Sequence, residues 1–351
     1  MSPDTSTRHA LNALPVIDIA PFLSGGSAAA REAVARELRR VCIDIGFFYL
    51  VGHGLSEAEL NEALARGRDF FRLPREEKEK LRFNTARFGY FPLGGTNEYG
   101  PGSTNKPGDL KERFSCTREA IPGEPEEGNF GAGQSRWPEE AVLPGFRDFF
   151  TAHIAKRAAL TRALAQVFAL SLDLPQDYFD TAFEHLGCVL MFNYYPKIDQ
   201  PAGEKDPHPI EPGRWSFSPH TDYGAFTLLL QDQLGGLQVR NSAGDWIDVT
   251  PLPGSFVINI GDMFAMWTND LYKSSLHRVM NFNDAERISL ALFTYPQGQT
   301  EIACLPSCRS EGNPPRYKPV QAEAYNRILV EQASRAGKPG LSTRTEERLR
   351  G

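Results

Sequence analysis

Three residues in the second half of the chain have side chains suited to binding a metal ion. His220-Thr-Asp222 places an imidazole two residues before a carboxylate, and His277 follows in Tyr272-Lys-Ser-Ser-Leu-His-Arg-Val279. Two imidazoles and one carboxylate on one side of a metal leave three adjacent positions open, which suits Fe(II) and oxygen chemistry. Seven histidines and 44 acidic residues in 351 positions give about 0.9 His-x-acid pairs by chance. Two interpretations therefore stay open: a metal site, or a core His277 with His220 in a surface turn.

A second feature is an arginine at the start of an apolar run. Arg287-Ile-Ser289 leads into Leu290-Ala-Leu-Phe-Thr-Tyr295. A guanidinium cannot shed its charge, so an arginine buried in such a strand needs an anion. A ligand carboxylate held by Arg287 and the Ser289 hydroxyl would supply charge-assisted hydrogen bonds. An internal acid, or exposure of the arginine at a sheet edge, would serve as well.

The elements that carry these residues are short strands. Runs rich in β-branched and aromatic residues are separated by turn residues at nearly regular intervals, which is typical of an antiparallel barrel or double-sheet roll. The expected strands cover 189–195, 226–230, 236–240, 246–249, 255–260, 274–282 and 287–295. We expect His220 and Asp222 at the mouth of the 226–230 strand and on one face, because residues i and i+2 of a strand share a face.

Helix patterns dominate elsewhere in the chain. They cover 28–41, 56–73 with a capping box at Ser56 and Glu59, 74–81, 146–172 and 321–336. Glycine-bounded residues 46–54 predict a strand. The segment 197–219, with Trp215 and Phe217, is a candidate lid or a simple linker, and the tail after Pro319 is another candidate lid.

Composition excludes several classes of protein. The net charge is −6 with both signs interspersed, so neither a nucleic acid nor an anionic membrane is an expected partner. No apolar run approaches the ~18 residues of a spanning helix, and the N-terminus lacks a secretory pattern, so we expect a cytoplasmic protein. Five scattered cysteines do not indicate a disulfide framework, and we expect no zinc at Cys304 and Cys308.

An ordered set of motifs connects these features. It comprises Asn193-Tyr-Tyr-Pro196, His220-Thr-Asp-Tyr-Gly224, Thr227-Leu-Leu-Leu-Gln-Asp232, Gly236-Leu-Gln-Val239, Asn259-Ile-Gly-Asp262, Tyr272-Lys-Ser274, His277-Arg-Val279 and Arg287-Ile-Ser289. This set resembles the 2-oxoglutarate/Fe(II)-dependent dioxygenases of the isopenicillin N synthase-like family, over Leu14 to about Pro319. The resemblance implies a mainly β fold with flanking helices and a double-stranded β-helix, or distorted jelly-roll, core. We expect an N-terminal region 1–185, a core 186–300 and a C-terminal segment 301–351 that form one catalytic unit.

The resemblance also assigns roles. It implies His220, Asp222 and His277 as ligands of Fe(II), with 2-oxoglutarate and O2 as co-substrates. Arg287 and Ser289 would hold the distal carboxylate of 2-oxoglutarate, and two further residues would lie beside it, namely Asn193 and Tyr195. The implied reaction is hydroxylation, desaturation or ring closure of a small organic molecule, with release of succinate and CO2. His53 matches a Gly-His-Gly motif of the family and is expected to be structural.

The primary substrate is less well defined. Residues expected near it are Phe293, Arg113, Ser115, Met191 and Tyr223. Arg113 would meet a substrate carboxylate or, alternatively, lie on the surface, and Phe293 would contact the substrate or pack as a core aromatic. Alternative functions are a 2-oxoglutarate-independent oxidase of the same fold and a non-catalytic ligand-binding relative. We expect a monomer that acts in secondary metabolism.

Overall fold

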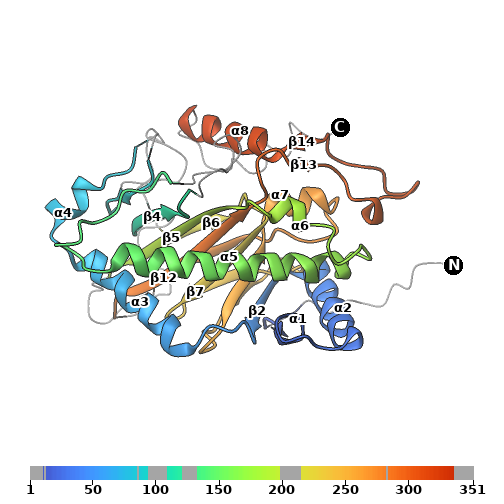
Figure 1. Cartoon of the computed structure of the whole chain (residues 1–351), viewed down its shortest axis with the longest axis horizontal. Coiled ribbons are helices and arrows are strands. Elements are labelled where there is room, and N and C mark those ends of the chain that lie inside the picture. Colours follow the sequence, from blue (N-terminus) through green and yellow to red (C-terminus); the bar gives the residue numbers. More distant parts are fainter. Residues whose placement is uncertain are drawn as a thin grey trace.

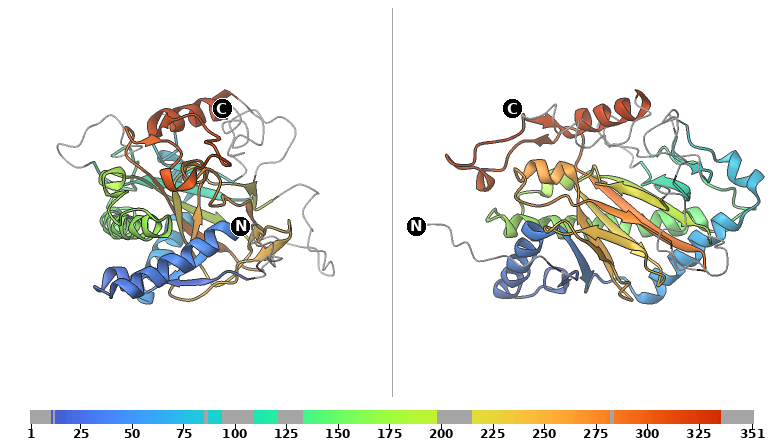
Figure 2. Two further views of the ribbon diagram at one scale, coloured as in Figure 1. Left: turned by 90° about the vertical axis from the view of Figure 1, so that its right-hand side faces the viewer. Right: turned by 180° about the vertical axis from the view of Figure 1, so that it is seen from behind.

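The computed structural model describes residues 11, 13–84, 87–93, 109–120, 133–197, 215–281 and 284–335. Its centre is a large sheet of eight strands, seen in Figures 1 and 2 with the long helix α5 across one face. The order is β1 (Val16–Asp18), β2 (Phe47–Val51), β10 (Phe256–Ile260), β7 (Phe226–Gln231), β12 (Arg287–Tyr295), β5 (Gly187–Tyr195), β4 (Glu112–Thr117) and β3 (Tyr90–Phe91). All neighbours pair antiparallel except β1 and β2.

A smaller sheet of four strands faces the large one across a cavity. Its order is β6 (Phe217–His220), β11 (His277–Val279), β8 (Leu237–Arg240) and β9 (Trp246–Asp248), and a separate pair is formed by β13 (Glu301–Ile302) and β14 (Val320–Gln321). Side chains from the eight-stranded sheet and from the four-stranded sheet line one cavity, so the two sheets enclose it between their inner faces. This double-sheet arrangement is the jelly-roll core that the motifs imply.

Helices cover the outer face of the large sheet. The helix α5 (Phe146–Ser171) packs against α2 (Ala28–Asp44) and against β12 and β5, and α3 (Glu57–Arg72) contacts β12, β5 and β7. The remaining helices are α1 (Ala20–Leu23), α4 (Arg75–Lys80), α6 (Asp180–Phe183), α7 (Asp262–Trp267) and α8 (Ala322–Arg335), with a 3-10 turn at Pro306–Cys308. Among the described residues no helix has both the length and the apolar character needed to cross a bilayer.

Most of the predicted elements are confirmed. The Ser56 hydroxyl accepts a hydrogen bond from the Glu59 N–H at 3.2 Å and starts α3, as the capping box predicts. His53 is buried, with its Nε2 3.0 Å from the Gly254 carbonyl and its Nδ1 accepting from the Leu55 N–H, which is the structural role expected of it.

Three predictions around the site are wrong in detail. The end of the segment 197–219 belongs to strand β6 (Phe217–His220) and is not loop, and residues 198–214 lie outside the described part of the chain. His220 therefore ends its own strand, while Asp222 lies in the connection to β7, so the two do not share a strand face. The strand expected over 274–282 is confined to β11. Strand β6 was hidden by Pro219, which lacks an N–H but is tolerated because β6 is an edge strand.

Candidate active site

The two histidines and the aspartate converge at one end of the jelly roll. His277 on β11 pairs across the small sheet with His220 on β6. The Oδ1 atom of Asp222 lies 3.8 Å from His220 Nε2 and 3.6 Å from His277 Nε2, and all three side chains are buried. One ligand atom from each residue lies within 4.8 Å of the others. Two imidazoles and one carboxylate in this arrangement form a donor set suited to a divalent metal such as Fe(II).

The backbone selects the histidine tautomers. His220 Nδ1 lies 2.7 Å from the carbonyl oxygen of Ser218, and His277 Nδ1 lies 3.2 Å from that of Ser275. A carbonyl can only accept, so each Nδ1 donates its proton to the backbone, and in the neutral ring Nε2, on the side of Asp222, is the nitrogen left to bind a metal. The rings are fixed further by Phe217, which stacks on His220 at 3.9 Å, and by Phe47, whose ring lies 5.2 Å from that of His277. Both imidazoles are thereby prepared for metal binding.

The second oxygen of Asp222 is held by neutral donors. The Thr227 hydroxyl donates to Oδ2 at 2.5 Å, and the Asn259 amide donates to the same atom at 2.7 Å. Hydrogen bonds to an ionised acceptor are short and strong, and both of these lie in the buried interior. The carboxylate is fixed in rotation, with Oδ1 toward the two imidazoles.

Two glycines let the turn with Asp222 pack closely, Gly261 where it meets the start of α7 and Gly224 where it meets β12. A Cβ on Gly261 would lie 2.1 Å from the Gly224 carbonyl oxygen, and a Cβ on Gly224 would lie 2.6 Å from the Thr294 carbonyl oxygen. This close approach lets the Asp262 N–H donate to the Asp222 carbonyl at 2.7 Å. The motifs His220–Gly224 and Asn259–Asp262 therefore form one unit that fixes the aspartate from its backbone as well as its side chain.

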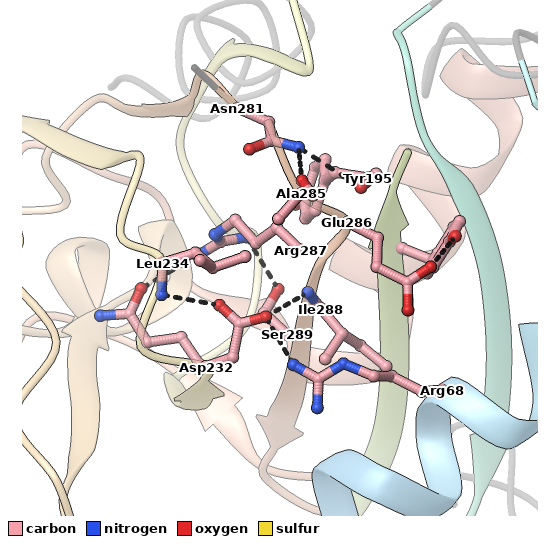
Figure 3. A network of polar contacts seen from close by, with 12 residues as sticks. Arg68, Tyr195, Asp232, Leu234, Asn281, Ala285, Glu286, Arg287, Ile288 and Ser289 are labelled. Atoms are coloured by element: carbon pink, nitrogen blue, oxygen red, sulfur yellow. Dashed lines mark hydrogen bonds and ion pairs between the residues drawn. The ribbon is translucent and has the colours of Figure 1, made fainter. Parts of the chain in front are cut away.

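Beside this cluster lies a fully buried arginine. Arg287 donates through Nε to the Gly235 carbonyl at 2.6 Å and through Nη2 to Gln231 Oε1 at 3.0 Å, and its Nη1 lies 3.5 Å from Ser289 Oγ (Figure 3). The guanidinium carbon lies 4.9 Å from the centre of the Tyr195 ring. All of these partners are neutral, and Arg287 makes no ion pair with an acid among the described residues. A buried guanidinium without a counter-ion is suited to an anionic ligand.

A network behind the arginine fixes the turn that it contacts. Asp232 accepts hydrogen bonds from the Ile288 N–H at 2.8 Å and the Leu234 N–H at 3.2 Å, and Arg68 on α3 donates to it at 2.8 Å (Figure 3). The Asp232 side chain is only 6% exposed, so these three donors compensate its desolvation. The Asp232 carboxylate therefore attaches its own turn to Ile288 of β12. The same turn supplies the Gly235 carbonyl that Arg287 contacts.

The cavity between the sheets brings most of the predicted site residues together. It is lined by Phe47, Asn193, Tyr195, Phe217, His220, Asp222, Thr227, Leu229, Leu237, Asn259, His277, Val279, Arg287, Ser289, Ala291 and Phe293. Asn193 lies on β5 directly opposite Ser289 of β12. Its buried Oδ1 has no hydrogen-bond partner among the described residues, so the amide is available to a ligand in the cavity.

The five residues predicted near the substrate separate into two groups. Phe293 lines the cavity, but Arg113, Ser115, Met191 and Tyr223 do not belong to its described lining. Arg113 pairs with Asn193 across β4 and β5, and Ser115 pairs with Met191, so these residues continue the site face of the sheet one strand further out. The Arg113 guanidinium lies 3.9 Å from the centre of the Phe91 ring, with Nη1 3.9 Å from the Met191 sulfur.

The sequence indicates no role for several residues of the site. Thr227 and Asn259 appear only as members of motifs, and Phe47 only as part of a strand. What identifies them is strand register: Asn259 pairs with both Phe47 of β2 and Thr227 of β7, and Thr227 pairs with Phe293 of β12. These contacts join segments far apart in the chain, so no local pattern indicates them.

Comparison with protein families gives two matches along the chain. Residues 186–296 match the model of the 2OG-Fe(II) oxygenase superfamily. Residues 14–140 match the model described as non-haem dioxygenase in morphine synthesis N-terminal. The first match contains the His/Asp/His cluster and Arg287, and the second contains Phe47.

Individual relatives agree with the family matches. A 2-oxoglutarate-Fe(II) type oxidoreductase, ppzC of Metarhizium rileyi, is 36% identical over 90% of this chain and 87% of its own length. Kihadalactone A synthase LFS of Citrus sinensis is 33% identical over 83% of this chain and 85% of its own. The crystal structure of Neurospora crassa T7H with alpha-KG and thymine is 26% identical, with a TM-score of 0.78 over 95% of this chain and 98% of that one. The structure of JOX2 with 2OG, Fe and JA gives a TM-score of 0.75 at 28% identity, over 97% and 89%.

Proposed function

The chain belongs to the 2OG-Fe(II) oxygenase superfamily and is a 2-oxoglutarate-dependent dioxygenase, and on that premise we propose that His220, Asp222 and His277 hold its Fe(II). The observation that carries this assignment is the convergence of the three ligand atoms within 4.8 Å in a buried cluster. The histidine contacts support it, because each Nδ1 is engaged by a backbone carbonyl and each Nε2 lies toward Asp222 Oδ1. When bound, the iron activates O2 so that 2-oxoglutarate is converted to succinate and CO2 while the substrate is oxidised.

We assign the co-substrate site to the neighbouring polar residues. Arg287 and Ser289 would hold the distal carboxylate of 2-oxoglutarate, with Asn193 and Tyr195 beside it. The support is chemical: a buried guanidinium has only neutral partners, and the Asn193 Oδ1 acceptor has none among the described residues. A dicarboxylate would supply the missing negative charge. The protein residues in this scheme bind, orient and exclude water.

We propose that the primary substrate is a small organic molecule with an apolar part. Apart from the residues assigned above and the donors to Asp222, the cavity walls are apolar, with Phe47 and Phe293 on either side of the Thr227–Asn259 pair. The solved structures of relatives hold thymine in T7H and JA in JOX2. Arg113, Ser115, Met191 and Tyr223 would contribute from the rim, with Arg113 meeting a carboxylate where the substrate carries one.

We infer that the regions 1–185, 186–300 and 301–351 act as one catalytic unit. Strands β1 to β4 of the first region belong to the same sheet as the core strands β5, β7, β10 and β12. Phe47 of the first region also lines the cavity. A core expressed without residues 1–185 would therefore lack part of both its sheet and its site.

The assignment of the metal and co-substrate sites is tested by anaerobic titration. Metal-free protein receives Fe(II) and then 2-oxoglutarate, and we expect a visible charge-transfer absorption band. His277→Ala should abolish the band, because it removes one of three ligands. A wild-type protein without the band, or a His277→Ala variant that keeps it, would contradict the assignment.

The substrate class is tested by succinate release. A panel of amino acid, aromatic, terpenoid and peptide candidates is supplied with Fe(II), 2-oxoglutarate and O2, and products are identified by mass spectrometry. We expect stimulation by compounds with an apolar part that fits between Phe47 and Phe293. Arg113→Ala should weaken the affinity for carboxylate-bearing substrates, and an unchanged affinity would rule out its role.

A further inference from the structure

We propose that Thr227 and Asn259 are positioning residues for the metal-binding carboxylate, and that they keep Asp222 in one-oxygen binding. This inference rests on the proposed role of Asp222 as a metal ligand. The two donors engage Oδ2 at 2.5 and 2.7 Å, whereas Oδ1 faces the two histidine Nε2 atoms. One oxygen of the carboxylate is thus reserved for the ion and the other for the protein.

The two donors are adjacent, because they lie opposite each other on neighbouring strands. Thr227 of β7 and Asn259 of β10 are direct register partners in the antiparallel ladder. Side chains of such a pair project from the same face of the sheet with their Cβ atoms about 5 Å apart. That spacing lets two different side chains reach one carboxylate oxygen at the same time.

The surroundings of the pair make these hydrogen bonds effective. The cross-sheet row reads Phe47, Asn259, Thr227, Phe293, so each polar residue has an aromatic neighbour on its outer side. Thr227 is 4% and Asn259 3% exposed. Water is poorly placed to replace a lost donor in such surroundings, so removal of either would leave Oδ2 short of a partner.

The arrangement has a consequence for the open positions of the site. An iron-binding carboxylate has two oxygens, and binding through both would use a position that the co-substrate or O2 requires. With Oδ2 held by two donors, rotation of the carboxylate toward the ion costs two charge-assisted hydrogen bonds. The pair thereby favours three protein ligand atoms and three open positions.

The test measures metal affinity, so it does not depend on turnover. Mn(II) serves as the probe ion and is titrated into metal-free protein, with free Mn(II) counted by its electron paramagnetic resonance. Thr227→Val and Asn259→Leu each remove one donor with little change of shape, and we expect the Kd for Mn(II) to rise about 10- to 100-fold, the usual effect of losing an outer partner of a ligand. Thr227→Ser keeps the hydroxyl and should restore nearly wild-type affinity.

Thr294→Val is the matched control. Thr294 is a fully buried threonine of the same sheet whose hydroxyl donates to the Phe226 carbonyl at 2.8 Å, away from Asp222. Its loss should lower the melting temperature of the metal-free protein but leave the Mn(II) Kd unchanged. If Asn259→Leu does not fold, Thr227→Val with its serine counterpart decides the outcome alone.

The outcomes separate this inference from the proposed function. Wild-type protein that binds no Mn(II) would overturn the metal site itself. Wild-type protein that binds Mn(II), together with donor-less variants of equal affinity, would leave the metal site intact and refute the positioning role. A fall in melting temperature of the metal-free variants without a change in Kd would likewise assign Thr227 and Asn259 a purely structural role.

Discussion

At the scale of single residues, the two fully buried arginines Arg287 and Arg157 show how position decides role. Arg287 opens into the cavity between the sheets. Arg157 lies under the other face of the large sheet, where it donates to the carbonyl oxygens of Leu228 and Leu290. Burial lowers the pKa of Arg157 to about 9. Both lack an acidic partner among the described residues, but only Arg287 faces space that a ligand could occupy.

Replacement of Arg287 should therefore separate co-substrate binding from metal binding. With Arg287→Met we expect the Kd for 2-oxoglutarate, measured calorimetrically on Mn(II)-loaded protein, to rise at least about 100-fold. Truncation of one partner in a buried, hydrogen-bonded charge pair costs about 2 to 5 kcal/mol, because the other charge is left unpaired. The Kd for Mn(II) should not change. Arg157→Met is the control, and it should destabilise the fold without altering 2-oxoglutarate affinity. If Arg287→Met and Arg157→Met lost equal affinity for 2-oxoglutarate, Arg287 would have no specific role in holding its carboxylate.

The sequence singled out the three residues of the His/Asp/His cluster and Arg287, but it predicted neither their geometry nor the residues that support them. His220 and Asp222 were expected on one strand face, yet the strand ends at His220 and the turn supplies Asp222. The side chains converge because Gly261 lets the backbone of α7 approach that turn. Arg287 and Ser289 do share one face of β12 and line the cavity, because alternation within one strand is a local property. Roles that depend on register between distant strands, such as that of Asn259, have no local pattern.

At the scale of elements, α3 is connected to the co-substrate site through Asp232. Arg68 on that helix donates to the Asp232 carboxylate, which also binds the backbone N–H of Ile288 on β12. The turn after β7 is held between them, and its Gly235 carbonyl receives the Arg287 Nε–H. The helix thus supports the guanidinium without touching it. The sequence predicted α3 from its capping box, but its role follows only from packing.

We expect Asp232→Asn to weaken 2-oxoglutarate binding while metal binding stays unchanged. The amide cannot satisfy Arg68 and two N–H groups as the carboxylate does, so the turn loses its fixed position. The predicted rise in Kd for 2-oxoglutarate is roughly 5- to 50-fold, smaller than that for Arg287→Met, because Arg287 and Ser289 themselves remain. Titration of Mn(II)-loaded protein measures it.

The same helix offers the control for this variant. Glu62 and Arg66 form an exposed i, i+4 pair on α3, 2.8 Å apart. Exposed pairs contribute about 0 to 1 kcal/mol, so Glu62→Gln should leave the 2-oxoglutarate Kd unchanged. If Glu62→Gln and Asp232→Asn raised the 2-oxoglutarate Kd equally, α3 would affect the co-substrate site only through its general stability and not through Asp232.

At the scale of the whole molecule, the long helix α5 carries a buried polar stripe. His153, Arg157 and Thr161 follow one another at i, i+4 and i+8, and each is at most 1% exposed. The Thr161 hydroxyl donates to the Arg157 carbonyl, while both His153 nitrogens lack a hydrogen-bond partner among the described residues. Burial, and then the charges of Arg157 and Lys156, lower the pKa of His153 to about 3. Glu59 lies 3.9 Å from His153 Nδ1, but its charge is already paired with Lys156 at 2.9 Å.

This histidine should make the molecule sensitive to mild acid. Unfolded His153 takes up a proton below about pH 6.5, whereas the folded state stays neutral until about pH 3, so stability is full above pH 6.5 and falls as the pH drops. By pH 5 this one group should lower the free energy of unfolding by about 2 kcal/mol relative to pH 7. Urea unfolding of metal-free His153→Phe should therefore show a smaller loss between pH 7 and pH 5 than the wild type. The control is Phe150→Leu, which alters a ring contact of His153 but removes no titratable group, so it should change the free energy of unfolding equally at pH 7 and pH 5. If His153→Phe lost as much stability between pH 7 and pH 5 as the wild type, this account would be refuted.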